Sequence, residues 1–343
     1  MTAKRYGQDS KVTSDIYHGG NLDEASVRFG TPQGGWLDLS TGINPVPYPV
    51  TDIPASDWMR LPDHAAERRL EAVAARHFGL ADPARLIATP GTQAVIQALP
   101  WLVRAKSVAI LGFTYQEHAH RWRQSGSQVE IVETLDDPRA AMADVVVVVN
   151  PNNPDGRIVS ADQLLALGAR LAATGGLLIV DEAFMDVLPR NLSLLPDLPE
   201  AGVAVLRSVG KTWGLAGLRL GFFAGPRDLV ERMRAFFGPW SVSGPALTIG
   251  ARAIGDEDWL AATIVRLKSD CDKLDCLLKA AGMQAVGGTP LFRLVRHGDA
   301  ETIFRRLAAA GILVRPFPAR SEWLRFGIPA TAHERDRLRQ AFE

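Results

Sequence analysis

The chain has 343 residues, of which 47% are hydrophobic and 22% are charged, an ordinary composition for a globular protein. Its 38 basic and 38 acidic residues cancel, so no overall charge would draw it to nucleic acid or to an anionic membrane. The length predicts a large domain with a smaller one beside it, and the apolar runs are too short to span a bilayer.

Cysteine usage and the N-terminal residues favour a reducing, cytoplasmic location. On the helix that we expect around them, Cys271 and Cys276 point to different faces, so we expect neither a local disulfide nor a metal pair. This usage is typical of a reducing compartment. Residues 1–10 are polar and lack the apolar stretch of a signal peptide.

The first sixty residues contain few signals for regular structure. Residues 1–36 are rich in glycine and polar residues, and we expect an arm that packs with the smaller domain and contains a short helix over 23–29. Residues 40–62 are rich in proline, which removes hydrogen-bond donors and fixes φ. We therefore expect a long loop or a crossing segment there.

Helices and strands alternate from Pro62 onwards. The valine run at 145–149 is apolar on both faces, which is typical of a buried, mostly parallel sheet flanked by helices. A glycine at position 79 predicts the end of the first helix. Helices are expected over 64–78, 92–103, 118–124 and 161–173, and strands over 86–88, 108–111, 129–132, 145–149, 177–180, 203–206 and 218–224.

The pattern changes after Pro226, where longer helices precede short strands. This predicts a large domain over 37–225 and a smaller α+β domain over 226–343. Helices are expected over 227–237, 244–254, 257–281, 299–310 and 332–342, and strands near 291–295, 312–315 and 323–326.

Candidate functional residues follow the expected strands, because ligands of open α/β sheets bind beyond the carboxyl ends of the strands. Gly91 and Thr92 open a helix, whose free N–H groups favour an anion. Tyr115 could stack on a planar ring, and the amide of Asn153 could donate to a phenolate oxygen. An ordinary capped helix, a packing aromatic and a turn are the structural alternatives at these positions.

A carboxylate and an amine follow the next strands. Asp181 ends a buried strand and must be paired, either structurally or with a protonated ring nitrogen. Lys211 lies among small residues between Ser208 and Arg219, without the spacing of a phosphate-binding P-loop. In this order, the residues match what pyridoxal phosphate needs. These needs are a cradle for its phosphate, an aromatic that stacks on its ring, a donor to its phenolate oxygen, an acid for its ring nitrogen and an amine for its aldehyde.

The segments 150–156, 181–184 and 208–221 together resemble fold-type I pyridoxal-phosphate enzymes of the class I/II aminotransferase family, over about residues 37–330. The resemblance implies an aspartate-aminotransferase-like α/β fold, with pyridoxal 5'-phosphate as cofactor and active sites at the interface of a homodimer. By position, the catalytic residues would be Lys211 (the lysine that holds the cofactor), Asp181 (the partner of the pyridine nitrogen) and Tyr115 (the stacking aromatic). The other implied cofactor-binding residues are Gly91, Thr92, Gln93, Asn153, Phe184, Ser208 and Arg219.

Within this family, the chain is most similar to the histidinol-phosphate aminotransferases and to the threonine-phosphate decarboxylases of cobalamin biosynthesis. The segments 18–21 and 39–45, and Phe184 where most aminotransferases have tyrosine, favour the decarboxylases. The implied reaction converts O-phospho-L-threonine to (R)-1-amino-2-propanol O-phosphate and CO₂. A histidinol-phosphate-type or other amino-acid aminotransferase stays open as the alternative, because it shares nearly every cofactor residue.

The resemblance also implies a site for a phosphorylated amino acid. Arg325 resembles the arginine that holds the substrate carboxylate, and Arg315 the one that binds the substrate phosphate. In one departure, Leu61 stands where many relatives have a tyrosine that reaches the partner subunit's cofactor phosphate, and leucine cannot donate that hydrogen bond. The remaining implied substrate-binding residues are His18, Gly19, Gly20, Ile43, Asn44 and Asn153.

Two other classes of protein fit the sequence poorly. A transcription regulator with an aminotransferase-like domain would carry a DNA-binding module of roughly 60–70 residues before the fold. Only about 36 residues precede it here, and the chain has no basic excess. A Rossmann dehydrogenase would have Gly-x-Gly-x-x-Gly after the first strand, which this sequence lacks. We therefore expect a cytoplasmic enzyme with no nucleic-acid, membrane or metal partner.

Overall fold

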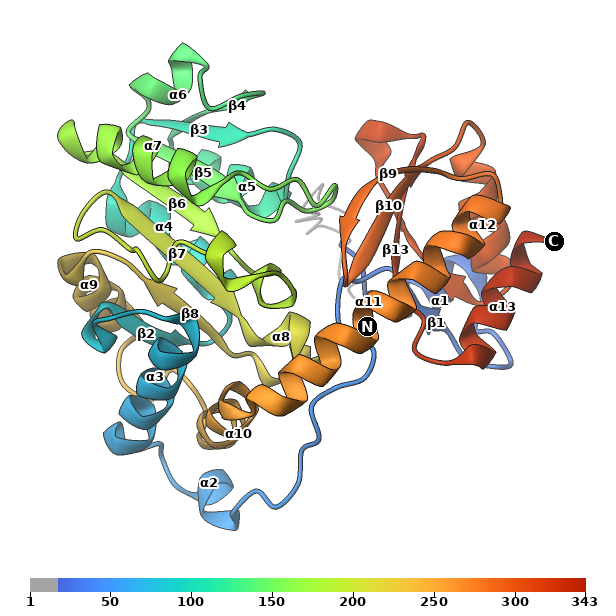
Figure 1. Ribbon diagram of the computed structural model, residues 1–343, viewed down its shortest axis with the longest axis horizontal. Coiled ribbons are helices and arrows are strands. Elements are labelled where there is room, and N and C mark those ends of the chain that lie inside the picture. Colours follow the sequence, from blue (N-terminus) through green and yellow to red (C-terminus); the bar gives the residue numbers. More distant parts are fainter. Residues whose placement is uncertain (1–17) are drawn as a thin grey trace, which may run out of the picture.

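The computed structural model describes residues 18–343, which form two lobes joined by one long helix (Figure 1). The larger lobe is built on a seven-stranded sheet, and the smaller lobe on a four-stranded antiparallel sheet. Of the expected N-terminal arm, residues 1–17 lie outside the described residues.

The large sheet has the strand order β2-β8-β7-β6-β5-β3-β4. Strand β8 runs antiparallel to both of its neighbours and the other neighbouring pairs are parallel, which confirms the expected mostly parallel sheet. The strands are β2 (Leu86–Thr89), β3 (Ser107–Leu111), β4 (Gln128–Val132), β5 (Val145–Val149), β6 (Leu177–Asp181), β7 (Val203–Ser208) and β8 (Gly221–Ala224).

Helices cover both faces of this sheet because successive side chains of a strand point to opposite faces. Val146 and Val148 of β5 pack in one core with α3, α6, α7 and α10, whereas Val145 and Val147 pack in a second core with α4, α5 and α9. These helices are α3 (His64–Phe78), α4 (Thr92–Val103), α5 (Gln116–Gln124), α6 (Pro138–Met142), α7 (Ala161–Ala173), α9 (Arg227–Phe237) and α10 (Gly244–Gly255).

Local capping explains why several helix ends agree with the sequence pattern. Asp63 accepts a hydrogen bond from the backbone of Ala66 at the start of α3, and Gly79 ends that helix in the left-handed conformation. Helix α7 begins with a capping box between Ser160 and Gln163. These ends are set by neighbouring residues, so the sequence alone predicts them.

The smaller lobe combines the C-terminal part of the chain with the described N-terminal residues. Strand β1 (Leu37–Asp38) pairs in parallel with β11, and Ala25 of α1 (Leu22–Phe29) is buried in the same core as Phe304 of α12. The other elements of this lobe are β9 (Gln284–Thr289), β10 (Phe292–Arg296), α12 (Ala300–Ala309), β11 (Ile312–Leu313), β12 (Arg315–Pro316), β13 (Trp323–Gly327) and α13 (Ala332–Phe342).

Helix α11 (Glu257–Ala280) runs from one lobe to the other. Leu260, near its start, belongs to a core of the large lobe, and Leu274 belongs to the core of the small lobe. Helices α9 and α10, which we expected in the smaller domain from residue 226 onwards, instead pack on the large sheet, because Val230 and Leu247 complete its two cores.

Some short elements differ from the expectations. The expected strand over 218–224 starts only at Gly221, because a 3₁₀ turn (Ala216–Leu218) and a left-handed Arg219 precede it. The proline-rich segment contains a short helix, α2 (Ala55–Met59). We also missed β9, α6 and the one-turn helix α8 (Val209–Thr212). Further 3₁₀ turns lie at Pro83–Arg85, Met185–Val187, Arg190–Leu192 and Pro318–Arg320.

Neither cysteine is in a disulfide, and Cys271 is buried. Over residues 18–343, no helix combines the length and the apolar character that a membrane span requires. The same residues contain no cluster of three or more side chains that could ligate a metal.

Candidate active site

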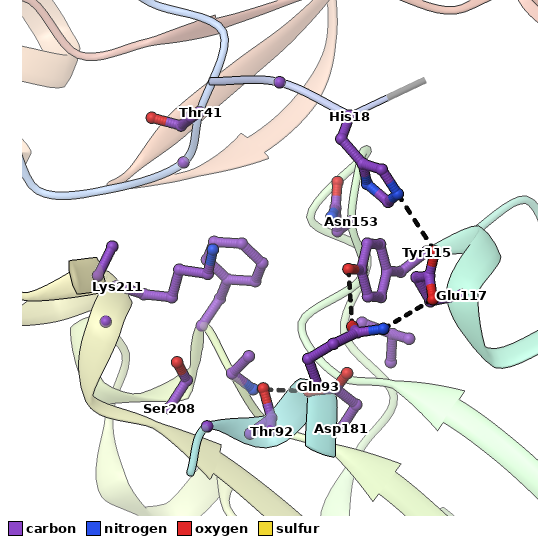
Figure 2. Close-up of a pocket in the computed structure, with 18 of the residues that line it drawn as sticks. His18, Thr41, Thr92, Gln93, Tyr115, Glu117, Asn153, Asp181, Ser208 and Lys211 are labelled. Carbon is purple, nitrogen blue, oxygen red and sulfur yellow. Dashed lines mark hydrogen bonds and ion pairs between the residues drawn. The ribbon is translucent and has the colours of Figure 1, made fainter. Parts of the chain in front are cut away.

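A cavity of about 520 Å³ lies between the two lobes, beyond the carboxyl ends of the parallel strands. Its walls come from the ends of β5, β6 and β7, from the starts of α4 and α5, and from β12 and β13 of the small lobe. Most of the residues singled out from the sequence line it (Figure 2). They are His18, Gly19, Gly91, Thr92, Gln93, Tyr115, Asn153, Asp181, Phe184, Ser208, Lys211, Arg219, Arg315 and Arg325.

Lys211 reaches into the cavity from α8, the single helical turn that follows β7. Its Nζ lies 5.5 Å from the centre of the Phe184 ring. Burial, and then the positive charges of Arg325, Arg219 and Arg315, lower the pKa of Lys211 to about 8, although Asp181 acts in the opposite direction. A larger share of this amine is therefore unprotonated near neutral pH than for an ordinary lysine.

The turn that carries Lys211 is held by Asn44, from the segment between β1 and α2. The backbone N–H of Asn44 donates to the Lys211 carbonyl at 2.9 Å, and its Nδ2 donates to the Thr212 carbonyl at 2.8 Å. Its Oδ1 accepts from Arg266 at 2.7 Å and from the Val46 N–H at 3.1 Å. The Asn44 amide is therefore bonded to other parts of the protein. Asn44 does not line the cavity, although we had expected it to contact the substrate.

Two other residues with expected substrate contacts, Gly20 and Ile43, do not line the cavity. The N–H of Gly20 donates to Ser40 Oγ at 2.7 Å. A Cβ atom on the neighbouring Gly19 would come within 2.3 Å of the Ser40 carbonyl oxygen. Glycine here lets the N-terminal segment pack closely against the residues that follow β1, and the preceding residue, His18, lines the cavity.

Asp181 ends β6 and is buried. His118 Nε2 lies 3.0 Å from its Oδ2, and the Ala183 N–H donates to Oδ1 at 3.1 Å. These contacts fix the carboxylate at the cavity wall, where it can accept from a protonated ring nitrogen. We did not single out His118 in the sequence, although it lies only three positions after Tyr115.

The start of α4 forms a cradle for an anion. Gly91, with φ of 82°, precedes the helix and no side chain caps its first N–H groups. A Cβ on Gly91 would lie 3.0 Å from Nη2 of Arg219, and one on Gly221 would lie 2.8 Å from the Thr92 nitrogen. Free N–H groups beside a guanidinium suit a phosphate.

Two arginines from the small lobe close the opposite side. Arg315 and Arg325 are paired across β12 and β13, and both are buried. Arg325 Nη1 donates to Asn153 Oδ1 at 2.5 Å, and its Nη2 donates to the Ser40 carbonyl at 2.8 Å. Burial, and then the charge of Arg315, lower the pKa of Arg325 well below its ordinary value. Two neighbouring buried guanidinium groups favour binding of anions.

Glu117 is another residue of the cavity wall that we missed. Its carboxylate accepts from Gln93 Nε2 at 2.7 Å, and Tyr115 donates to Gln93 Oε1 at 3.1 Å. Burial, followed by the charges of Glu117 and Asp181, raises the pKa of Tyr115 to about 12. The phenol therefore keeps its proton at neutral pH. Thr41, Gly42 and Arg121 also line the cavity without having been expected there.

The chain is similar to known proteins over nearly its whole length. A threonine-phosphate decarboxylase from Pseudomonas aeruginosa is 42% identical over 316 residues, which are 92% of this chain and 93% of that protein. Another from Sinorhizobium sp. is 42% identical over 332 residues, 96% of this chain and 98% of that protein.

Solved structures agree in fold. A histidinol-phosphate aminotransferase from Sinorhizobium meliloti in complex with pyridoxal-5'-phosphate has a TM-score of 0.79 at 21% identity, covering 98% of both chains. An L-threonine-O-3-phosphate decarboxylase from Porphyromonas gingivalis has a TM-score of 0.71 at 17% identity, covering 88% of this chain and 97% of that one. The model of the family "Aminotransferase class I and II" matches residues 55–342. The chain therefore belongs to the class I and II aminotransferase family and has its aspartate-aminotransferase-like fold.

Proposed function

We propose that the protein decarboxylates O-phospho-L-threonine with pyridoxal phosphate as cofactor, releasing CO₂ and (R)-1-amino-2-propanol O-phosphate for cobalamin biosynthesis. Full-length similarity to two threonine-phosphate decarboxylases supports this activity. The structural observation that carries the proposal is the pair of buried arginines, Arg315 and Arg325, in the cavity that contains Lys211. A phosphorylated amino acid has two anionic groups, and the pair supplies two guanidinium partners for them.

The residues of the cavity fit pyridoxal phosphate. Lys211 supplies the amine for its aldehyde and Asp181 the carboxylate for its ring nitrogen. The uncapped start of α4, with Ser208 and Arg219, would hold its phosphate, and the missing Cβ of Gly91 leaves room for that group. When bound, this cofactor supplies an electron sink that weakens the bonds at the substrate's α-carbon.

The protein's own residues would decide which bond of the α-carbon breaks. Arg325 would bind the substrate carboxylate and Arg315 the phosphate, so the two ends of the substrate are fixed from one side of the cavity. Decarboxylation requires the bond to the carboxylate to stand perpendicular to the cofactor ring, whereas amino transfer requires the Cα–H bond there. Asn153 would act with Arg325, whose Nη1 already contacts its Oδ1 at 2.5 Å.

We also propose a homodimer. Trp58, Met59 and Leu61, on and just after α2, are 70%, 81% and 66% exposed, which is unusual for large apolar side chains so close together. A second copy of the chain would cover them, as the family resemblance implies. Leu61, which cannot replace the tyrosine hydroxyl of relatives, would then contribute an apolar contact.

The proposal is tested by comparing two reactions of the purified holoenzyme. In one, CO₂ release from O-phospho-L-threonine is measured. In the other, L-histidinol phosphate and 2-oxoglutarate are supplied and glutamate is measured. We expect kcat/KM for decarboxylation to exceed that for amino transfer by several orders of magnitude. Efficient glutamate formation without CO₂ release would instead identify an aminotransferase.

A further inference from the structure

Glu117 is a buried carboxylate in the cavity wall that has no part in the function proposed above. It lies in the first turn of α5 and is 4% exposed. Its Oε2 accepts from Gln93 Nε2 at 2.7 Å and from Arg121 Nε at 3.3 Å. Its Oε1 lies 3.2 Å from His18 Nε2. Figure 2 shows His18, Glu117, Gln93 and Tyr115 joined in one chain of contacts along this wall.

The charge of Glu117 gives this chain a direction. Burial alone would raise the pKa of Glu117, but the hydrogen bond from Gln93 and the charges of Arg121 and His18 lower it overall. An ionised carboxylate only accepts hydrogen bonds. Gln93 must therefore turn its NH₂ group towards Glu117 and its carbonyl oxygen towards Tyr115.

The orientation of Gln93 in turn fixes the hydroxyl of Tyr115. The Gln93 carbonyl oxygen can only accept, so the phenol donates its proton to that oxygen, at 3.1 Å. The phenol cannot then donate the same proton to a ligand, and its oxygen presents lone pairs to the cavity. The bond also anchors the far end of the ring, which limits how the ring can move.

We propose that Glu117 is a positioning residue that acts through Gln93 to hold Tyr115 in one orientation, with the ring in place to stack on the cofactor and the hydroxyl oxygen acting as an acceptor. This rests on the proposed function, because it needs pyridoxal phosphate as the cofactor and Tyr115 as the aromatic that the family resemblance implies stacks on it. The other oxygen of Glu117 contacts His18, so the same carboxylate joins the N-terminal segment to the wall that holds the cofactor.

A double-mutant cycle tests this role by measuring the equilibrium dissociation constant of pyridoxal phosphate for the apo protein. Glu117→Gln keeps the size of the side chain but removes its charge, so the Gln93 amide is free to turn. Tyr115→Phe keeps the ring but removes the hydroxyl. We expect each single variant to raise the dissociation constant about fivefold, as for the loss of one hydrogen bond. In the double variant the constant should be no higher than in Tyr115→Phe alone, because both changes break the same chain.

Glu71→Gln is the matched control. Glu71 is also a buried carboxylate of the large lobe, bonded to Arg234 and to the Ala88 backbone, but it does not line the cavity. We expect this change to lower the thermal stability and leave the dissociation constant unchanged. A constant that rises equally in Glu71→Gln would assign the Glu117 effect to general destabilisation and overturn the inference.

Two further results would also overturn it: an unchanged constant in Glu117→Gln, or effects that multiply in the double variant. Cofactor binding and CO₂ release by the wild-type protein distinguish failure of this inference from failure of the proposed function. If the wild-type protein binds pyridoxal phosphate and the cycle shows coupling, the inference stands even when no CO₂ is released. If the wild-type protein does not bind the cofactor at all, both proposals fail.

Discussion

The protonation state of Lys211 is set by its burial and by a few neighbouring charged side chains. Three arginines and burial disfavour its ammonium form, and Asp181 alone among the named contributions favours it. Two of these guanidinium groups, Arg315 and Arg325, would also receive the anionic substrate, so the substrate site helps to keep the amine partly unprotonated before the substrate arrives. The protonation state of Lys211 and the binding of an anion by the neighbouring arginines are therefore coupled through charge rather than through direct contact.

The depressed pKa of Lys211 predicts the pH dependence of cofactor attachment. Only the neutral amine reacts with the aldehyde, and the ammonium form loses its proton as the pH rises through the pKa. The rate of covalent attachment to the apo protein should therefore rise with pH and reach half of its maximum near pH 8. Borohydride trapping at timed intervals, followed by peptide mass spectrometry, measures this rate. A midpoint near the ordinary lysine value of 10.5 would contradict the described environment.

Arg325 is expected to be sensitive to a change that keeps its charge. Lysine cannot reproduce a two-pronged contact with a carboxylate, so Arg325→Lys should raise KM for O-phospho-L-threonine roughly 10- to 100-fold and leave cofactor affinity nearly unchanged. Steady-state kinetics with saturating cofactor measure this effect. Arg320→Lys is the control, because Arg320 lies over the rings of Phe113 and Trp323 and does not line the cavity. A similar KM in both variants would exclude the assigned role of Arg325.

At the scale of secondary-structure elements, the start of α4 determines the anion site. A glycine at positive φ precedes the helix and no side chain caps its start, so its first N–H groups are left free for an anion. Arg219 approaches from a left-handed position in the loop before β8. Backbone geometry on both sides therefore leaves space that a phosphate would occupy.

Adding a methyl group at Gly91 should weaken cofactor binding. In Gly91→Ala the new Cβ would meet Arg219 Nη2 at 3.0 Å, and φ of 82° is strained for alanine. We expect the dissociation constant of pyridoxal phosphate to rise at least tenfold and the free energy of unfolding to fall by about 1 kcal/mol. Gly217→Ala, in the same loop as Arg219, meets nothing within 4 Å and should change neither quantity. Equal affinities in the two variants would argue against a phosphate site here.

Elements with strong local signals were predicted from the sequence, and elements that depend on distant partners were not. Helices α3 and α7 and strand β5 have the expected bounds, because side-chain caps and β-branched runs act locally. Helix α4 also has the expected bounds, although a glycine rather than a capping side chain precedes it. Strand β9 was missed because its sequence, QAVGGT, contains two glycines and lacks alternation. Helices α9 and α10 were predicted, but the sheet on which they pack is decided by contacts far along the chain.

The same division applies to the candidate site. Residues at or just after strand ends, such as Asp181 and Lys211, could be singled out because the fold class brings strand ends together. Asn44 was expected in the cavity, but its amide bonds to a carbonyl 168 positions away. We missed Glu117 and His118 because their roles depend on contacts with Gln93 and Asp181. The sequence does not show which residues will contact those two side chains.

At the scale of the whole molecule, the cavity exists only where the two lobes meet. The large lobe provides the amine, the acid and the anion cradle, whereas the small lobe provides His18, Arg315 and Arg325. Helix α11 has buried residues in the cores of both lobes. A relative movement of the lobes would change the distance between the small-lobe arginines and Lys211. Substrate binding and the geometry of the reaction therefore both depend on how the two lobes are placed.

The exposed apolar side chains around α2 predict the oligomeric state. Light scattering coupled to size-exclusion chromatography should give a mass of twice 37.2 kDa. Trp58→Arg should shift the mass towards that of a single chain at low protein concentration, because a charge would be buried in the interface. Val27→Arg is the control, since Val27 is 89% exposed on α1, outside this patch. A single-chain mass for the wild-type protein would contradict the proposed dimer.

The fate of the substrate carboxylate tests the account most directly. The holoenzyme is incubated with O-phospho-L-threonine labelled with ¹³C in the carboxyl group, in the presence of 2-oxoglutarate, and the products are followed by ¹³C NMR. If Arg325 and Arg315 orient the substrate for decarboxylation, the label is recovered as CO₂ and bicarbonate and no glutamate forms. Label retained in a keto acid, with an equal amount of glutamate, would contradict the account and make the protein an aminotransferase.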